Sequence, residues 1–268
     1  MRSLLASSGS LTASEAEQLI DPRRLVAGQR DLAAMPLDRL QPLVRTVYTS
    51  HATWALFTVE WMSSMKRLLD QLAEHSRQES STSSRRRVLE VCAGRGALTR
   101  PMRARGIDWQ STDVNPPSAS DAEAVTRCGA LQAVQERLLA QRDAESGDGA
   151  RCDQGDLTAV VWAWWSKPKV SSKKKRKAAG TSSDEDEPPS PQPAALDEDR
   201  KVAECCMEAG VPVVFVSEPR GGITGSLSLW DGSYTIVPAV DLVEDFVDVP
   251  NWPGFSDRTW VILPDRRR

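Results

Sequence analysis

Apolar residues recur at helical spacing through the first part of the chain. Between residues 14 and 44, apolar residues recur at roughly helical spacing, at Leu19, Leu25, Leu32, Leu37, Leu40, Leu43 and Val44, which is typical of one helix face. Pro22, Pro36 and Pro42 interrupt this pattern, and proline ends or kinks a helix. The pattern therefore predicts several short helices, followed by a longer one from about Thr53 to Glu74.

Beyond residue 85 the apolar positions form short continuous runs, which are typical of buried strands. The expected strands are VLEV, IDWQSTDVN, LTAVVWAWW, VPVVFVSEP, YTIVPAV and TWVIL. Helical patterns separate the first four of them: ALTRPMRARG, SASDAEAVTRCGALQAVQERLLAQRDAE and RKVAECCMEAG. The second of these patterns predicts one long helix or two abutting ones.

Strands that alternate with helices predict a parallel sheet with helices on both faces, joined by right-handed crossovers. The last two apolar runs are joined by a loop and predict an antiparallel hairpin at the edge of the sheet. We therefore expect an α/β fold: a Rossmann-like, doubly wound and mostly parallel sheet in three layers. An antiparallel C-terminal edge hairpin and an N-terminal helical extension complete it.

The composition changes abruptly in one internal segment. Residues 166–199 hold a basic block, an acidic block and a stretch rich in proline and serine, with little apolar surface to bury. This composition predicts a disordered charged insertion. The expected domain organisation is a loose N-terminus over residues 1–13, a helical extension over 14–80, and an α/β domain over 85–268 that carries the insertion.

Overall composition excludes several classes of protein. The 268 residues are 40% hydrophobic and 26% charged, with a net charge of -3, which provides no general attraction to nucleic acid. No apolar run approaches the roughly 18–20 residues needed to cross a membrane, so no membrane partner is expected. Five cysteines show neither a CxxC pair nor zinc spacing. They predict reduced thiols, no metal site and an intracellular protein.

A basic block, KKKRK, spans Lys173 to Lys177 and is followed by SSDEDE. Blocks of this length act as nuclear-import signals or contact the phosphate groups of nucleic acid. Opposite charges in a disordered loop also serve simply to keep it solvated. All three alternatives stay open, so the expected location is cytoplasmic or nuclear, and a nucleic-acid partner is not favoured.

The stretch VLEVCAGRG combines an apolar run with an acid and two glycines. Gly94 and Gly96 are expected at the carboxyl end of a strand, where doubly wound sheets bind ligands. Their missing Cβ atoms let backbone approach a ligand closely. Glu90 lies within the apolar run, and a buried carboxylate needs a partner. Asp113 is expected at the tip of the next strand, where a carboxylate can accept hydrogen bonds from both ribose hydroxyls of an adenosine.

Two common nucleotide-binding motifs do not fit this stretch. A nicotinamide cofactor requires GxGxxG, whose third glycine is replaced by Thr99, and a Walker A loop requires Gly-Lys-Ser/Thr. The pattern acid-x-small-x-Gly-x-Gly, followed by an acid at the second strand, instead resembles the class I S-adenosylmethionine-dependent methyltransferases. Glu90, Gly94 and Gly96 are in register with the first motif of that family, whereas Cys92 stands where a glycine is usual.

This resemblance is strongest over Val88 to Asn115, and it implies both a function and a site. The chain would bind S-adenosylmethionine (SAM) and transfer its methyl group to an acceptor that the sequence does not identify. The cofactor-binding residues that it implies are Glu90, Ala93, Gly94, Gly96, Asp113 and Val114. Two alternatives remain: an α/β turn whose glycines serve geometry only, and a non-catalytic scaffold with the methyltransferase fold.

The acceptor side of the expected site rests on three residues. In this family the loop after the fourth strand commonly carries (Asp/Asn)-Pro-Pro-aromatic when the target is an amine of a base or an amide, but this chain has WAWWSKP. Trp164 and Trp165 are candidates for stacking on a flat substrate, or for capping the sheet. Glu218 ends another expected strand and is the candidate catalytic residue, as a proton acceptor or as a substrate anchor. The alternative for Glu218 is an exposed acid at a turn.

Overall fold

The computed structural model of the chain describes residues 11–23, 25, 29–51, 55–77, 86–116, 125–145, 157–162, 198–218 and 227–265. The first ten residues and most of the expected charged insertion therefore lie outside the described residues. Glu198 and Asp199, the last part of the segment that the sequence assigned to the insertion, instead begin a helix.

In the described part of the chain, seven strands form one sheet in the order β3-β2-β1-β4-β5-β7-β6. The strands are β1 (Arg87–Glu90), β2 (Asp108–Asp113), β3 (Val125–Arg127), β4 (Leu157–Trp162), β5 (Val213–Ser217), β6 (Thr235–Pro238) and β7 (Arg258–Leu263). Neighbours from β3 through β5 are parallel, whereas β7 is antiparallel to both β5 and β6. The order runs outward in both directions from β1 and β4, so the sheet is doubly wound. The expected parallel sheet with an antiparallel edge hairpin is confirmed.

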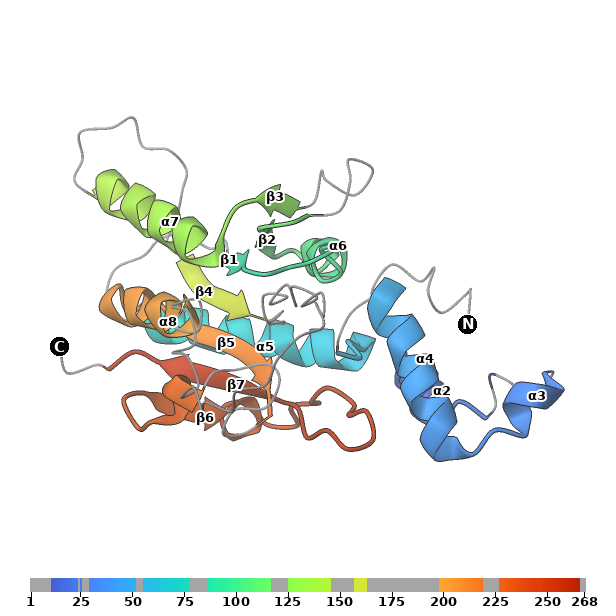
Figure 1. Cartoon of the computed structure of the whole chain (residues 1–268). Helices are drawn as coiled ribbons and strands as arrows, with labels where there is room; N and C mark the ends of the chain where they lie inside the picture. Colours follow the sequence, from blue (N-terminus) through green and yellow to red (C-terminus); the bar gives the residue numbers. More distant parts are fainter. Residues whose placement is uncertain are drawn as a thin grey trace, which may run out of the picture.

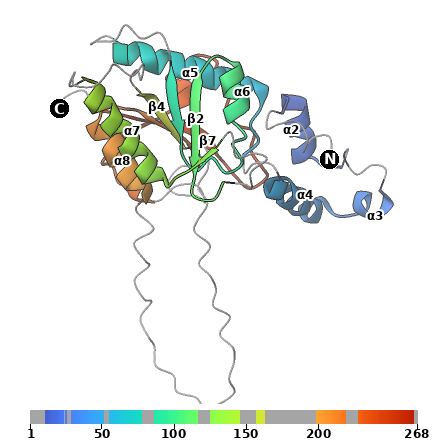
Figure 2. The same ribbon diagram turned by 90° about the horizontal axis from the view of Figure 1, so that it is seen from above.

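Helices cover both faces of the sheet, which confirms the three expected layers (Figures 1 and 2). These helices are α5 (Val59–Arg77), α6 (Thr99–Ala104), α7 (Ala130–Glu145) and α8 (Glu198–Glu208). Val88 and Val161 pack toward α5 and α6, while Leu89 and Val160 pack toward α7 and α8. Because both faces are covered, β1, β4 and β5 are buried along their whole length.

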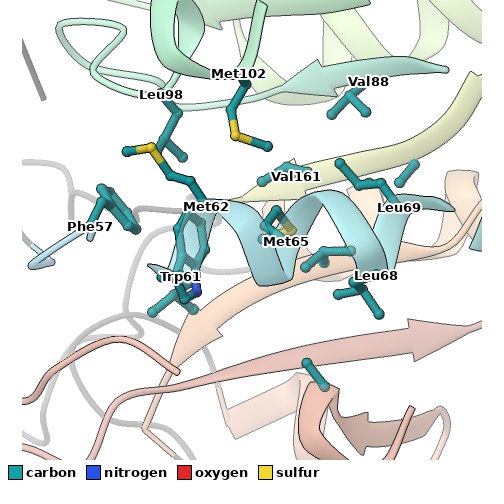
Figure 3. Packing of buried hydrophobic residues seen from close by; sticks show 14 of the residues in the cluster. Phe57, Trp61, Met62, Met65, Leu68, Leu69, Val88, Leu98, Met102 and Val161 are labelled. Carbon is teal, nitrogen blue, oxygen red and sulfur yellow. The ribbon is translucent and has the colours of Figure 1, made fainter. Parts of the chain in front are cut away.

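The long helix α5 is the main helix of one layer. Trp61 and Met65 are fully buried, and Figure 3 shows Met62 directed toward Leu98 and Met102 beside the sheet. This helix therefore belongs to the core of the α/β domain. The buried face of α5 packs on the sheet and on α6, so we propose that the α/β domain also includes this helix, which precedes the boundary expected near residue 80.

The N-terminal extension consists of α2 (Ala13–Ile20), α3 (Arg30–Ala33) and α4 (Leu37–His51), which lie together on the right of Figures 1 and 2. A capping box starts α2: the Thr12 hydroxyl accepts the N–H of Glu15, and the Glu15 carboxylate accepts the N–H of Thr12. Leu11 is only 1% exposed and pairs with Thr58. Leu11 and Thr12 therefore make specific contacts, although they fall in the segment 1–13 for which the sequence predicted a loose N-terminus.

A separate apolar cluster joins the extension to the rest of the molecule. Its buried members are Leu11, Ala16, Leu19, Leu40, Val44, Tyr48, Leu56 and Trp252. Trp252 comes from the loop before β7, and its ring centre lies 5.7 Å from that of Tyr48. The extension is thus fixed against the C-terminal part of the sheet domain. Among the described residues, no helix has the length and apolar character needed to span a bilayer.

One helix begins later in the structure than the sequence predicted. The sequence predicted helix from residue 118 to residue 145, but Val125–Arg127 forms the edge strand β3 and α7 begins only at Ala130. Val125 pairs with Ser111 of β2 and is 3% exposed. Burial and sheet pairing therefore override helix propensity in this short segment, since propensity is worth only a few tenths of a kcal/mol per residue. The remaining connections contain short turns of 3₁₀ helix, η2 (Leu227–Trp230) and η3 (Ala239–Asp241).

A hydrogen-bond relay ties α5 to β7, and it can be cut at one hydroxyl. Trp61 Nε1 donates to Thr259 Oγ1 at 2.9 Å, and Thr259 Oγ1 donates to Asp248 Oδ1 at 2.7 Å. We expect Thr259→Val to lower the free energy of unfolding by about 1–3 kcal/mol, because it leaves the buried indole N–H without an acceptor. Chemical denaturation measures this loss. Thr235→Val on the exposed edge of β6 is the matched control and should change stability little; equal losses in the two variants would contradict the relay.

Candidate functional site

The carboxyl ends of β1 and β2 lie side by side and carry the glycine turn. Their parallel register places Glu90 opposite Ser111, and the chain then turns through residues 91–98 before α6 begins. The structure brings together the whole set that the sequence singled out on this side: Glu90, Ala93, Gly94, Gly96, Asp113 and Val114. The turn formed by residues 91–98 is called the glycine loop below.

Asp113 fastens the glycine loop to the end of β2. Its Oδ2 accepts the N–H of Gly94 at 2.9 Å, and its Oδ1 accepts the N–H of Asn115 at 2.7 Å. The N–H of Ala93 donates to the carbonyl of Thr112, also at 2.9 Å. Each carboxylate oxygen has a second lone pair, so Asp113 keeps the capacity to accept further hydrogen bonds while it holds the loop.

The backbone of the glycine loop is left-handed at three positions, with φ of +55° at Cys92, +56° at Gly94 and +68° at Gly96. A residue with a Cβ atom pays about 1–2 kcal/mol for this conformation. The departure at Cys92 therefore introduces strain at the position where the related motif has glycine. Burial raises the pKa of the Cys92 thiol to about 12, so this thiol is not a nucleophile at neutral pH.

Gly96 has no room for a side chain. A Cβ atom there would lie 2.6 Å from Val125 Cγ2 and 2.9 Å from Thr99 Oγ1, well inside van der Waals contact. The glycine thus permits close packing of the loop on β3 and on the start of α6. Close packing, as well as the positive φ, therefore explains why a glycine stands at position 96.

Glu90 is a buried acid with two hydrogen-bond donors beneath the loop. It is 3% exposed, and its Oε2 accepts both Trp109 Nε1–H and the Ser111 hydroxyl, each at 2.7 Å. Because the Ser111 proton goes to Glu90, the Thr99 hydroxyl is the donor in the 2.7 Å contact between Thr99 and Ser111. Among the described residues no donor bonds to the other oxygen, Oε1.

Burial raises the pKa of Glu90 to about 7, although the hydrogen bonds from Trp109 and Ser111 lower it and the nearby charge of Asp113 raises it. A carboxyl with this pKa is poised between its neutral and ionised forms at physiological pH. A positively charged ligand at the loop would favour the ionised form. Such perturbed acids gather at functional sites.

The hydrogen bonds of the loop decide which kind of ligand it fits. The N–H groups of Ala93, Gly94 and Gly96 donate to Thr112, Asp113 and Ala93 respectively, so they are not aimed at a ligand. A loop that binds phosphate uses such N–H groups as its main contacts. The carboxylates of Glu90 and Asp113 lie beside these used N–H groups, together with the apolar side chain of Val114, which is 62% exposed. This set fits a cofactor that has a cationic group, ribose hydroxyls and a flat ring.

Sequence reasoning missed the partners of Glu90. Trp109 and Ser111 alternate along β2 and therefore point to the same face of the sheet, and Ser111 lies opposite Glu90. The alternation was readable in IDWQSTD, so it was a usable signal. Thr99 entered the sequence analysis only as a mismatch to a nucleotide motif, whereas the structure gives it a place in the network under the loop.

Glu218 lies at the carboxyl end of β5, and β4 separates that strand from β1. Its Oε1 accepts the N–H of Ser256 at 3.2 Å. The structure therefore places Glu218 at the same edge of the sheet as the glycine loop but does not bring the two together. Trp164 and Trp165, the candidates for stacking on a substrate, lie outside the described residues.

The sequence did not reveal which charged side chains lie near Glu218. Arg45 of α4 stacks on Phe255, with its Cζ 3.6 Å from the ring centre, and Asp257 is 5% exposed. Burial and, to a smaller extent, the charge of Glu218 raise the pKa of Asp257 to about 6, while Arg45 opposes the shift. In the described part of the chain, no three side chains of the metal-ligating kinds gather as a metal site.

A Cβ atom at Gly96 would clash with its neighbours. We therefore expect Gly96→Ala to lower the free energy of unfolding by more than backbone strain alone would. Gly210 has a similar φ of +70°, but a Cβ atom added there would meet nothing within 4 Å, so Gly210→Ala should lose about 1–2 kcal/mol. Gly96→Ala adds overpacking, which costs about 1–3 kcal/mol more. Urea titration of both variants measures the difference. If Gly210→Ala loses as much as Gly96→Ala, close packing at the loop is not the cause.

The raised pKa of Glu90 predicts how stability depends on pH. Between the ordinary value of 4.5 and about 7, the folded chain binds the Glu90 proton more tightly than the unfolded chain does, so stability falls as pH rises through this range. Glu90→Gln keeps an acceptor for Trp109 and Ser111 but cannot ionise. We expect it to match wild type near pH 4 and to exceed it at pH 8 by about 3 kcal/mol.

Unfolding titrations of wild type and Glu90→Gln from pH 4 to pH 8 measure this difference. Asp257 titrates equally in both proteins, so its contribution cancels. A difference that stays constant across the range would show that Glu90 ionises in the folded chain without penalty.

No protein-family model and no curated protein matches the sequence. Among solved structures, the chain is similar to magnesium protoporphyrin IX methyltransferase from Synechocystis PCC 6803, crystallised with bound SAM. The two are 9% identical, the match covers 77% of this chain and 81% of that one, and the TM-score is 0.34. So distant a similarity carries no argument about site or activity, and the fold assignment rests on the sheet order and layers of the chain itself.

Proposed function

We propose that the chain is a SAM-dependent methyltransferase, a transferase that moves a methyl group to an acceptor still to be identified. The observation that carries this proposal is the hydrogen bonding of the glycine loop. Its N–H groups at Ala93, Gly94 and Gly96 are used within the protein, while Glu90 and Asp113 offer acceptors. A loop of this kind suits a cationic adenosine cofactor better than a pyrophosphate, which supports SAM over a nicotinamide dinucleotide.

Three residues beside the glycine loop have a proposed part in holding the cofactor. Asp113 would accept from the ribose hydroxyls, and Val114 would lie against the adenine. Glu90, ionised by the nearby positive charge, would attract the ammonium group and keep the loop in place through Trp109 and Ser111. When bound, SAM supplies a methyl group carried on a positively charged sulfur.

The acceptor is proposed to lie toward β5, at the same edge of the sheet. Methyl transfer depends mainly on positioning the donor and the acceptor in line, so the chain needs a pocket more than a strong base. Glu218 at the end of β5 would take the proton that the acceptor gives up. Its carboxylate is held in place by the N–H of Ser256.

Binding of the cofactor can be measured before any acceptor is known. Thermal unfolding of wild type with SAM, with S-adenosylhomocysteine and with NAD compares the two classes of cofactor. A ligand at about 100 times its Kd stabilises the folded state by roughly 2.7 kcal/mol, which is a rise in Tm of several degrees for a chain of this size. We expect this rise with SAM and S-adenosylhomocysteine and none with NAD.

Two variants locate the binding site. Asp113→Ala should abolish the rise in Tm, and Val114→Ala should weaken binding severalfold without altering the free protein, because Val114 is largely exposed. Val240→Ala, an exposed valine beyond β6 at the far side of the sheet, is the matched control. No rise at millimolar SAM would overturn the proposal and favour the scaffold; a rise that survives Asp113→Ala would move the site elsewhere.

A further inference from the structure

The hydrogen bonds under the glycine loop distinguish the two oxygens of Glu90. Oε2 accepts both the indole N–H of Trp109 and the hydroxyl of Ser111, each at 2.7 Å. A carboxylate oxygen has two lone pairs, so these two donors fill Oε2. No side chain or N–H in the described part of the chain donates to Oε1. When Glu90 carries a proton, that proton therefore lies on Oε1.

Thr99 fixes the direction in which the Ser111 hydroxyl points. The two hydroxyl oxygens lie 2.7 Å apart, and both side chains are buried. Because a hydroxyl has a single proton to give, a Thr99 that donates to Ser111 leaves the Ser111 proton for Glu90. Trp109 needs no such help, since an indole N–H can only donate. These side chains thus occupy Oε2 in both charge states of Glu90.

Few charged or titratable groups face the Glu90 carboxyl. Asp113 at the tip of β2 and Cys92 of the glycine loop lie within reach of its charge. From α6, Arg103 is turned to the carbonyl of Trp109, to which its Nε donates at 2.7 Å. The residue opposite Glu90 on β4 is apolar, and α5 presents methionines to this face of the sheet. Among the described residues no cation forms an ion pair with Glu90, so a positive charge beside it has to come from a ligand.

The ionisation of Glu90 falls in the range where such a ligand can change it. Burial raises the pKa of this carboxyl to about 7, so it is partly protonated near neutral pH. A cation at the glycine loop favours the ionised form. The hydrogen bonds from Trp109 and Ser111 also favour that form, because both donors are directed at the charge.

We propose that Ser111 and Trp109 are positioning residues for the cofactor, which hold Oε2 of Glu90 so that a proton and the cofactor's positive charge exclude each other at Oε1. The inference rests on the proposed function and adds one step to it. When the cofactor binds, the O–H bond at Oε1 breaks, its electron pair stays on the oxygen, and the proton goes to water. The carboxylate that results attracts the cofactor's ammonium group.

Proton release on binding can be measured directly. S-adenosylhomocysteine and methylthioadenosine are the probes, because both are adenosine thioethers but only the first has an ammonium group. Each is titrated into the full chain by isothermal calorimetry at pH 6.5, in two buffers of different ionisation enthalpy. With a pKa near 7, we expect S-adenosylhomocysteine to release up to roughly three quarters of a proton and methylthioadenosine none. Glu90→Gln should abolish the release.

Ser111→Ala tests the positioning role. It removes one donor to the ionised carboxylate, and a hydrogen bond to a charged group is worth about one pKa unit. We expect this variant to bind S-adenosylhomocysteine about four- to eightfold more weakly than wild type at pH 6.5, but within about twofold of it at pH 8. Ser217→Ala is the matched control: Ser217 is a buried serine at the end of β5 whose hydroxyl donates to the carbonyl of Glu218. It should keep the wild-type pH profile.

Stability without ligand separates this inference from the proposed function. Urea unfolding of Ser111→Ala should show a larger loss at pH 8, where Glu90 is ionised, than at pH 5, and this difference should vanish in the Glu90→Gln background. A loss that is equal at both pH values would overturn the positioning role whether or not a ligand binds. Binding of S-adenosylhomocysteine without proton release would overturn the exchange at Oε1 and leave the proposed function standing. No binding at millimolar concentration would overturn the proposed function and, with it, the exchange.

Discussion

The glycine loop depends on one buried carboxylate. Glu90 is the last residue of β1, and its Oε2 accepts the indole N–H of Trp109 and the hydroxyl of Ser111, both from β2. Through Ser111 the same network reaches Thr99, where α6 begins. One acid therefore fixes the end of the first strand, its neighbour and the helix that follows. Its cost is desolvation, which an amide in its place would avoid. A chain selected only for stability would have little reason to keep an acid there.

Much of the sheet could be predicted from the sequence, because its strands are short apolar runs that turns and helices separate. The strand β3 could not, since a three-residue edge strand has too few positions to show a period. Helix α5 was expected in the extension over residues 14–80, because the polar residues SRQESSTSSRRR after it separate it from the first expected strand. Its apolar stripe was recognised, but a stripe does not say which surface will cover it.

The candidate site residues also differ in whether the sequence could predict them. Glu90, Gly94, Gly96 and Asp113 lie in one short stretch of sequence, and a local motif finds them. The charged group near Glu218 includes Arg45 of α4 and Asp257 before β7. These residues come from opposite ends of the chain, so no local pattern connects them.

The cluster around Trp252 has a consequence for how the chain is made. The helices α2 and α4 leave the ribosome before the loop that precedes β7, but Trp252 of that loop completes their apolar cluster. In the same way, Trp61 of α5 finds its hydrogen-bond acceptor only in Thr259 of β7. Domains generally fold as units. The apolar faces of α2, α4 and α5 therefore stay partly uncovered until the segment that carries Trp252 and Thr259 has been synthesised.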